Sequence, residues 1–187
     1  MDNKKQTLSK WSADGIDWFA IACKTYEERR IANALQKLCD INSVGSYFVF
    51  VPTKDRAHTK EISGMRRVPW LNGYVFIATN KSAEHCTKMV DSLKVNDTAI
   101  FKLLSYDGSK VASMTDKDKM LFWAILDDDF HIPALKADMV DGRVKIAENQ
   151  IEANGGKITK VDRRKQSALV EMQIMNESMK YEVALEF

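Results

Sequence analysis

Basic side chains cluster near the end of the chain, in a pattern that could hold phosphate groups. They follow one expected strand and the turn after it: Lys157, Lys160, Arg163, Arg164 and Lys165. Arginine forks can grip phosphates bidentately or read guanine edges, and lysine adds diffuse charge. By strand parity Lys157 and Lys160 fall on opposite faces unless a bulge or twist intervenes. An RNA stem-loop fits this arrangement, and a solvated hairpin tip fits it equally well.

Catalytic chemistry finds little support in the sequence. It contains no glycine-rich phosphate loop, no nucleophile elbow and no His-Glu-x-x-His pair. His58, His85 and His131 lack the spacing of zinc ligands, as do the cysteines. The acidic run 127–129 could bind a cation, but a solvated linker accounts for it more simply. We therefore expect a protein that is not an enzyme and that needs no metal and no cofactor.

Composition sets the broad class of the protein. The 187 residues suffice for one medium domain or for a medium and a small one, and 45% apolar residues can form a sizeable core. A net charge of +2 does not by itself indicate a nucleic-acid binder. Cys23, Cys39 and Cys86 have no paired spacing and follow no secretory signal, which predicts reduced thiols in a cytoplasmic protein. No apolar run approaches the roughly 18 residues that a membrane span requires.

The stretch Val68–Thr79 is the element around which the first part of the chain is arranged. Pro69 blocks a helix, Asn72-Gly73 permits a tight turn, and Tyr-Val-Phe-Ile then predicts a central strand buried on both faces. The order of elements favours an α/β domain with a largely antiparallel sheet and helices packed on it. Further strands are predicted at 16–23, 47–51 and 99–105. Helices are predicted from the capping box Thr25–Glu28 to Asp40, over Ser82–Leu93, and from the cap Thr115–Asp118 through Ile125. The basic segment Lys54–Arg67 is predicted to be a projecting hairpin or loop.

The last part of the chain has a different pattern. Residues 127–138 are acidic and then contain Pro133, which predicts a linker. Beyond it apolar residues alternate, which predicts a small all-β barrel. We expect a flexible arm at 1–15, the α/β domain at 16–126, the linker at 127–138 and the barrel at 139–187. The residues predicted to face inward are Ala168, Val170, Met172 and Ile174 on one strand and Met179, Tyr181, Val183, Leu185 and Phe187 on the next.

Taken in order, these segments resemble the NusG family of transcription elongation factors over residues 17–187. Trp18-Phe19, Tyr26-Glu27 and the strand after Gly73 resemble a NusG N-terminal domain, and Gly156–Asp162 with the closing strands resembles a KOW domain. Asn72 replaces the usual turn proline, and Glu148–Asn154 replaces a Gly-Pro-Phe turn. These departures and the basic turn resemble specialised paralogues such as the LoaP-type antiterminators, which use an RNA hairpin.

The resemblance implies an aromatic groove that receives the clamp helices of the largest RNA polymerase subunit. By position it selects Phe19, Tyr26, Leu71, Tyr74 and Phe76, of which Tyr74 is the strongest candidate. Ordinary core packing is the alternative, above all for Phe19 and Phe76. His85 and Thr87 lie where some paralogues place a second polymerase contact, although an exposed helix turn explains them more simply.

The resemblance also implies that the KOW domain binds a nascent RNA hairpin and that the protein promotes processive elongation as a monomer. The basic segment Lys54–Arg67 could contact nontemplate or upstream DNA, or be a mobile loop. Two other functions remain open. One is a general NusG-like factor whose KOW domain binds a ribosomal protein or a termination helicase. The other is a KOW-containing protein of ribosome assembly or RNA processing.

Overall fold

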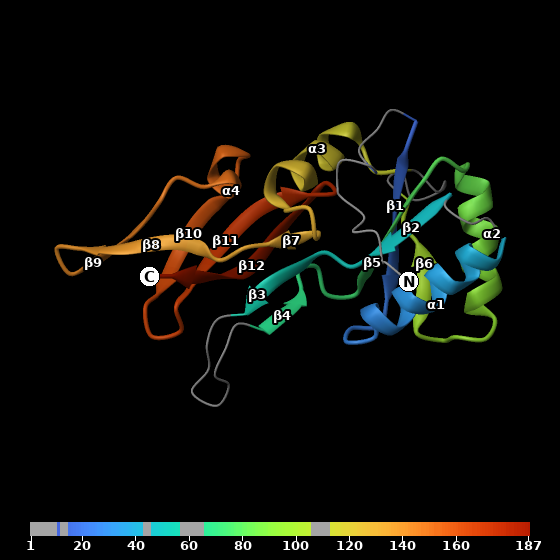
Figure 1. Ribbon diagram of the computed structural model, residues 1–187, viewed down its shortest axis with the longest axis horizontal. Coiled ribbons are helices and arrows are strands. Elements are labelled where there is room, and N and C mark those ends of the chain that lie inside the picture. Colours follow the sequence, from blue (N-terminus) through green and yellow to red (C-terminus); the bar gives the residue numbers. More distant parts are fainter. Residues whose placement is uncertain (1–10, 12–14, 43–45, 57–65, 106–112) are drawn as a thin grey trace, which may run out of the picture.

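The N-terminal half of the protein is built on an antiparallel sheet with the strand order β2-β5-β1-β6 (Figure 1). The computed structural model describes residues 11, 15–42, 46–56, 66–105 and 113–187. The strands are β1 (Asp17–Cys23), β2 (Tyr47–Phe50), β5 (Tyr74–Thr79) and β6 (Ile100–Leu103). The predicted central strand β5 pairs with β1 and β2 and is buried on both faces, which confirms that prediction.

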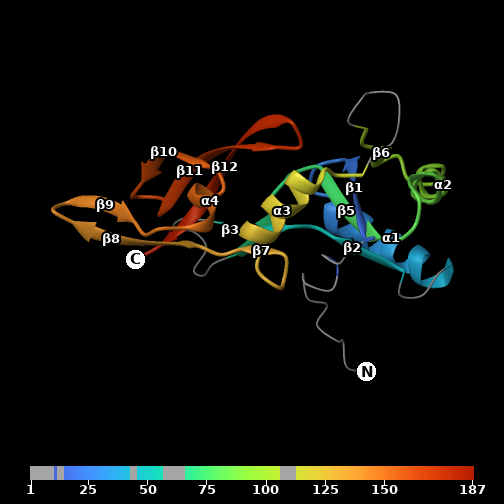
Figure 2. The ribbon, with the colours of Figure 1, turned by 90° about the horizontal axis from the view of Figure 1, so that it is seen from above.

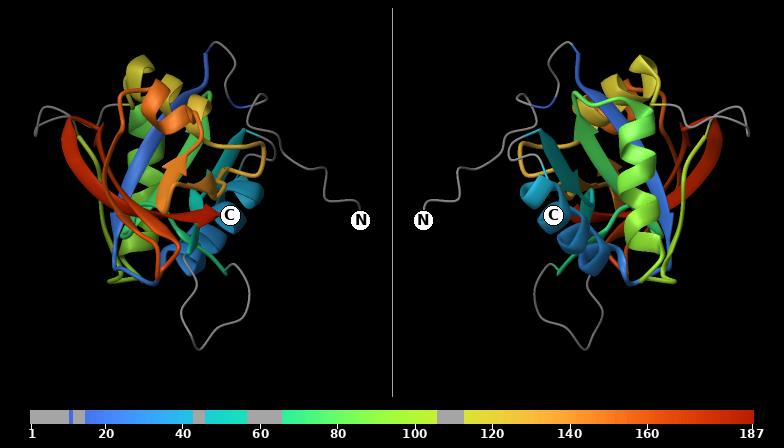
Figure 3. Two further views of the ribbon diagram at one scale, coloured as in Figure 1. Left: turned by 90° about the vertical axis from the view of Figure 1, so that its left-hand side faces the viewer. Right: turned by 90° about the vertical axis from the view of Figure 1, so that its right-hand side faces the viewer.

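Alternation along the strands gives this sheet two apolar faces. Phe19 and Ile77 point toward α1 (Glu28–Asn42) and α2 (Ala83–Lys94), and these helices cover that face (Figure 3, right). Trp18 and Phe76 point to the opposite face, where they pack with Phe122 of α3 (Asp116–Ile125). Both faces are therefore closed by other parts of the chain.

Helix starts were predicted with mixed success. Ser82 caps α2 and Thr115 caps α3, each by accepting a backbone N–H three residues later. The capping box predicted at Thr25–Glu28 is wrong, because α1 begins only at Glu28. The Glu28 carboxylate instead accepts a hydrogen bond from the backbone N–H of Gly73 at 2.7 Å. It thus holds the turn before β5, where Gly73 has a φ of 80°.

The C-terminal half forms a second, nearly closed sheet with the order β10-β11-β12-β8-β9. Its predicted inward residues are buried, except that Met179 is half-buried and Phe187 is exposed at the chain end. Figure 2 shows α3 between this sheet and the N-terminal one. The elements are β8 (Leu135–Val140), β9 (Arg143–Ile146), α4 (Gln150–Ala153), β10 (Lys157–Asp162), β11 (Ser167–Ile174) and β12 (Glu177–Glu186).

Strand pairing continues through the segment predicted as a linker. Residues 127–138 contain β7 (His131–Ile132) and the start of β8. β7 pairs in parallel with β3 (Thr53–Arg56), which forms a hairpin with β4 (Arg66–Pro69), while β8 pairs in parallel with the end of β12. The buried His131 ring lies 3.3 Å from the Asp55 carboxylate and 2.9 Å from Thr53 Oγ1. The division of the chain into domains at this segment stays a prediction.

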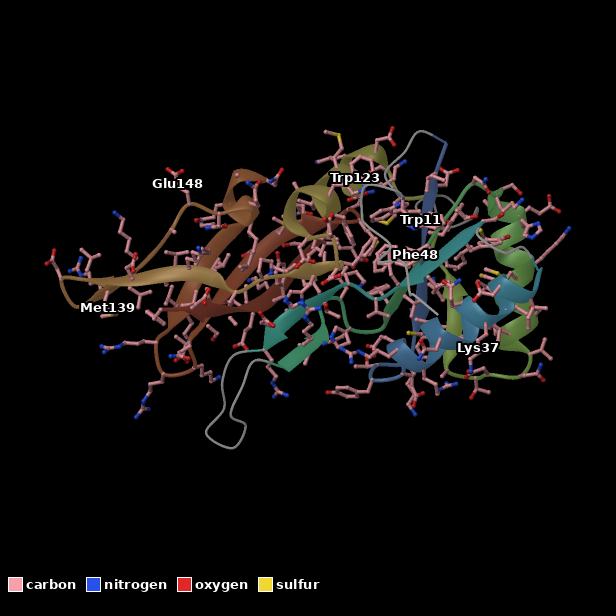
Figure 4. The ribbon with its side chains drawn as sticks, viewed as in Figure 1. Trp11, Lys37, Phe48, Trp123, Met139 and Glu148 are labelled. Atoms are coloured by element: carbon pink, nitrogen blue, oxygen red, sulfur yellow. The ribbon has the colours of Figure 1, made fainter. Side chains whose placement is uncertain are left out.

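Some predicted segments lie largely outside the described residues. The tip of the Lys54–Arg67 hairpin, 57–65, is one of them, and its described base forms β3 and β4. Of the predicted arm, residues 1–10 and 12–14 lie outside as well. Trp11 is described, and it is buried with its ring stacked on Phe48 at 5.4 Å (Figure 4).

The two halves touch, a point that the sequence left open. Trp70 packs edge-on against Tyr181 with 5.4 Å between ring centroids. Asp118 of α3 accepts a hydrogen bond from the backbone N–H of Met175 at 3.0 Å. Lys54 Nζ donates to the carbonyl oxygen of Glu182, and burial lowers the pKa of Lys54 to about 8. One continuous apolar cluster accordingly runs from Trp18 to Leu185.

Gly156 is the described glycine of the C-terminal half that has the least room for a side chain. A Cβ there would lie 2.5 Å from Ile151 Cγ2 of α4 and 2.8 Å from Met172 Cε of β11, both buried in the core. We expect Gly156→Ala to lower the free energy of unfolding by about 1–3 kcal/mol, since an overpacked core must shift. Urea denaturation measures this. The control is Gly142→Asn, because Gly142 has open space around it and asparagine tolerates its positive φ. Equal midpoints for Gly156→Ala and wild type would contradict the expectation.

The cysteines are buried and free. Burial raises the pKa of Cys23 to about 11 and that of Cys39 and Cys86 to about 12, so their thiols stay protonated at neutral pH. Among the described residues, no helix is long and apolar enough to cross a membrane. Within the same residues, no cluster of His, Cys, Asp and Glu side chains could hold a metal ion.

Candidate functional site

Tyr74 lies at the start of β5, on the sheet face that looks toward the C-terminal half. Its ring is half-buried, and clefts open beside it at the junction of the two halves. One cleft, of about 350 Å³, is bounded by Ala20 and the turn Met175–Glu177. Another, of about 400 Å³, is bounded by Leu71 and by Met179–Glu182 of β12. Burial, together with the nearby Glu177 carboxylate, raises the pKa of Tyr74.

The other predicted groove residues separate into distinct places. Leu71 and Phe76 lie on the same side of the sheet as Tyr74 and are fully buried in the cluster that joins the halves. Phe19 is 1% exposed and faces α1 and α2, on the other side of the sheet. Tyr26 is 94% exposed and lines a different cleft. The structure therefore brings Leu71, Tyr74 and Phe76 together, and it leaves Phe19 and Tyr26 out of that group.

His85 and Thr87 belong to the first turns of α2. The backbone N–H of His85 donates to Ser82 Oγ at 3.4 Å, and its exposed ring lies 6.1 Å from the ring of Tyr47. Thr87 Oγ1 donates to the carbonyl of Ala83 at 2.9 Å. Because α2 packs on the face opposite Tyr74, His85 and Thr87 form a surface separate from the Tyr74 clefts.

A bulge at Thr159 brings two of the predicted basic residues onto one face. Lys157 is in register with Glu171, whereas Lys160 is in register with Leu169, so the register shifts between Ile158 and Lys160. Glu171 and Leu169 both alternate with the buried residues of β11 and point outward. Lys157 and Lys160 therefore share the outward face, which settles the parity question that the sequence left open.

The basic turn extends this outward face. Asp162 Oδ1 accepts hydrogen bonds from the backbone N–H groups of Arg164 at 3.0 Å and Lys165 at 3.1 Å. These hydrogen bonds, led by that from Lys165, lower the pKa of Asp162. The side chains of Arg163, Arg164 and Lys165 are all exposed. The charged Asp162 carboxylate also attracts Lys165 and Lys160, whereas the exposed Arg163 and Arg164 side chains can bind an anionic ligand.

Sequence reasoning missed the residues that dock the halves on each other. The sequence around Asp118 indicated only that it helps to cap α3. Its hydrogen bond with Met175 joins residues 57 positions apart, which no local pattern predicts. The turn Met175–Asn176 has positive φ at both residues, which allows it to project toward α3. No local pattern indicates which surface such a turn will meet.

Comparisons with known proteins agree with this architecture. A profile of the family described as "Transcription termination factor nusG" matches residues 16–120, more than half of the chain. A search of curated proteins found no match. A solved structure described as "Domain interaction in Thermotoga maritima NusG" is similar with a TM-score of 0.57 and 16% identity, over 90% of this chain and 93% of that chain. At this identity the likeness shows the fold alone.

Weaker similarity extends to two conformations of an MjSpt4:Spt5 complex. Both are 11% identical over 89% of this chain and 91% of that chain, with TM-scores of 0.29 and 0.32. Scores this low carry no argument about the present chain.

Proposed function

Because this chain belongs to the NusG family of transcription factors, we propose that it binds RNA polymerase through the surface around Tyr74 and nascent RNA through its C-terminal sheet. In this proposal it is a specialised antitermination factor of the LoaP type. It promotes processive elongation by bridging polymerase and RNA. This role needs neither a catalytic step nor a cofactor. The observation that carries the proposal is the pair of surfaces: an aromatic hollow at Tyr74 and a basic outward face on β10.

The proposed polymerase surface centres on the half-buried Tyr74, with the buried Leu71 and Phe76 packed in the cluster beneath it. An aromatic ring beside a hollow offers a partner helix a large apolar contact and a polar hydroxyl. In the present structure the turn Met175–Glu177 and β12 bound these hollows. A clamp helix that enters them must therefore displace the C-terminal sheet, at the cost of the Trp70–Tyr181 and Asp118–Met175 contacts. His85 and Thr87 would provide a second polymerase contact from α2.

The proposed RNA surface consists of the basic side chains that the bulge at Thr159 brings onto one face. Lys157 and Lys160 face outward beside the turn that carries Arg163, Arg164 and Lys165. The neighbouring ion pair joins Glu171 to Lys180 at 3.5 Å, so that carboxylate is already partly neutralised. The two halves are covalently joined, and two modest contacts therefore combine through effective concentration. The hairpin β3–β4 would lie next to nontemplate or upstream DNA.

A specific observation favours a second candidate function for the C-terminal sheet. The β8–β9 hairpin projects outward with exposed Met139 and Val140, and β9 ends the strand order (Figure 4). An exposed strand edge with apolar side chains can pair with a protein partner, such as a ribosomal protein or a termination helicase. In that case the protein would be a general NusG-like factor.

Co-purification and salt titration test the proposal. We expect the tagged protein to be a monomer and to recover RNA polymerase from cytoplasmic extract. The amount of RNA that it captures should fall steeply as the salt concentration rises. Recovery of ribosomal particles without polymerase would assign the protein to ribosome assembly instead. A C-terminal partner that stays bound at high salt would favour apolar docking on β8–β9.

A further inference from the structure

A polar cleft of about 560 Å³ lies where the turn before α1, the β3–β4 hairpin and β12 meet. It adjoins the Tyr74 cleft that β12 bounds, with which it shares Lys54, Asn72 and Glu182, but Tyr74 does not line it. The proposed polymerase and stem-loop contacts do not use it. Its volume lies within the range of pockets that hold small ligands or single nucleotides. The residues of its wall that matter here are Tyr26, Arg29, Lys54, Arg56, Arg67 and Glu182.

The arginines of this cleft keep most of their donors for a ligand. Arg29 Nη2 donates to the backbone carbonyl of Arg67 at 3.1 Å, which uses one of its five N–H groups. Arg67 Nη1 lies 4.0 Å from the Asp129 carboxylate, beyond hydrogen-bond distance. Arg56 is exposed at the end of β3. Three guanidinium groups thus converge on one cavity with donor capacity left over.

The carboxylates of the same wall are engaged by the protein. Glu28 is 1% exposed and accepts the hydrogen bond from Gly73. Asp55 lies 3.3 Å from His131. The charge of Glu182 is partly balanced by Lys54, whose ammonium donates to the carbonyl of the same residue. Glu28 and Asp55 make these contacts within the wall, whereas Arg29, Arg56 and Arg67 line the cleft with N–H groups left over, so an anion can be held beside the guanidinium groups.

Tyr26 adds an aromatic surface to this site. Its ring is exposed, and its backbone has a φ of 73° in a turn closed by the hydrogen bond from Glu27 N–H to the Lys24 carbonyl at 3.1 Å. Bulky residues seldom adopt that backbone conformation, and such strain concentrates at functional sites. An exposed ring beside guanidinium groups is the combination on which unpaired bases stack.

We propose that this cleft binds an unpaired segment of RNA, with a base stacked on Tyr26 and phosphates held by Arg29, Arg56 and Arg67. The inference rests on the RNA-binding function proposed above, because the cleft continues the basic face of the C-terminal sheet. Glu182 is in register with Leu169, which is in register with Lys160. Figure 1 shows the β10–β11 turn and the β3–β4 hairpin along the same lower edge. A strand that leaves a hairpin held at β10 would run into this cleft.

Fluorescence anisotropy of the full-length protein with a labelled oligouridine of about 12 nucleotides tests the proposal. Tyr26→Asn removes the ring but tolerates the positive φ, and we expect it to weaken binding by about tenfold. Tyr26→Phe, the matched control, should bind like wild type. Arg56→Gln with Arg67→Gln should weaken binding and reduce the slope of log K against log salt by about 0.7 for each phosphate that the variant no longer neutralises. Arg143→Gln, on the exposed part of β9, should have no effect.

Three results would overturn the inference. The first is an oligouridine affinity of Tyr26→Asn equal to that of wild type. The second is that wild type does not bind oligouridine at protein concentrations up to about 100 µM. The third is tighter binding of oligothymidine than of oligouridine, which would assign the cleft to DNA. The proposed contact between the basic turn and an RNA hairpin is tested by a different result. If Arg163→Ala with Arg164→Ala leaves stem-loop binding intact while Tyr26→Asn still loses oligouridine, the cleft stands and the proposed hairpin contact does not.

Discussion

Replacing Tyr74 with alanine is expected to reduce the affinity for RNA polymerase by about 30-fold or more, the effect of losing an interface hot spot of about 2 kcal/mol. Tyr74 is the half-buried aromatic residue that the clefts on either side share. A partner helix seated there would bury the rest of the ring, so truncation removes apolar contact at the centre of the interface. Pull-down with purified polymerase over a concentration series measures the change.

Matched variants separate this effect from a general loss of structure. Tyr74→Phe keeps the ring and should keep most of the affinity. Phe19→Leu alters the opposite side of the sheet, and at equal folded fraction it should bind polymerase like wild type, because Phe19 lies under α1 and α2. Wild-type recovery of polymerase by Tyr74→Ala, with an unchanged thermal melt, would place the polymerase surface elsewhere.

Replacing Arg163 and Arg164 together with alanine is expected to weaken stem-loop RNA binding by about 100-fold at low salt, since each charge-assisted hydrogen bond contributes about 1.5–3 kcal/mol. Both side chains are exposed on the turn whose backbone Asp162 holds. Polymerase binding should stay unchanged. Gel shifts with stem-loops enriched from a random pool by the wild-type protein measure the loss.

The control for this experiment is a second pair of exposed basic residues on the same sheet. Arg143 and Lys145 lie on β9, at the opposite end of the strand order from β10. Arg143→Ala with Lys145→Ala removes the same net charge and should change RNA affinity by less than about threefold if binding is local to the β10 turn. Equal losses from the two double variants would indicate diffuse attraction instead of a defined contact.

Much of the fold could be predicted because its signals are local. The apolar run after Gly73 predicted a strand buried on both faces, and alternation from Ala168 to Ile174 predicted one buried face of β11. The first pattern is a continuous apolar run and the second repeats over two residues, and both involve only residues close together in the chain, so they need no knowledge of distant partners. The predictions failed where a side chain had a distant partner: Glu28 fitted a cap of its own helix but bonds to Gly73, 45 positions away.

The candidate site was predictable only in part, for the same reason. The residue types at Tyr74 and at the basic turn could be read directly, but whether Lys157 and Lys160 share a face depended on the bulge at Thr159. Parity along an ideal strand gives the opposite answer. A bulge arises from how β10 pairs with β11, which the sequence of β10 alone does not reveal.

Neighbouring positions in the chain were enough to predict the main strands and helices of the N-terminal half, the alternating strands β11 and β12, the family and the residue types that the proposed surfaces use, because periodicity, turn residues and charge clusters are local properties. They did not predict β7, the start of β8 or α4. The folded arrangement was needed to show that Phe19 faces away from Tyr74, that the basic residues of β10 align, and that β12 and the turn Met175–Glu177 lie against the Tyr74 clefts. Those outcomes depend on contacts such as Trp70 with Tyr181 and Asp118 with Met175. Their free energies come from surfaces that meet only after the chain has folded.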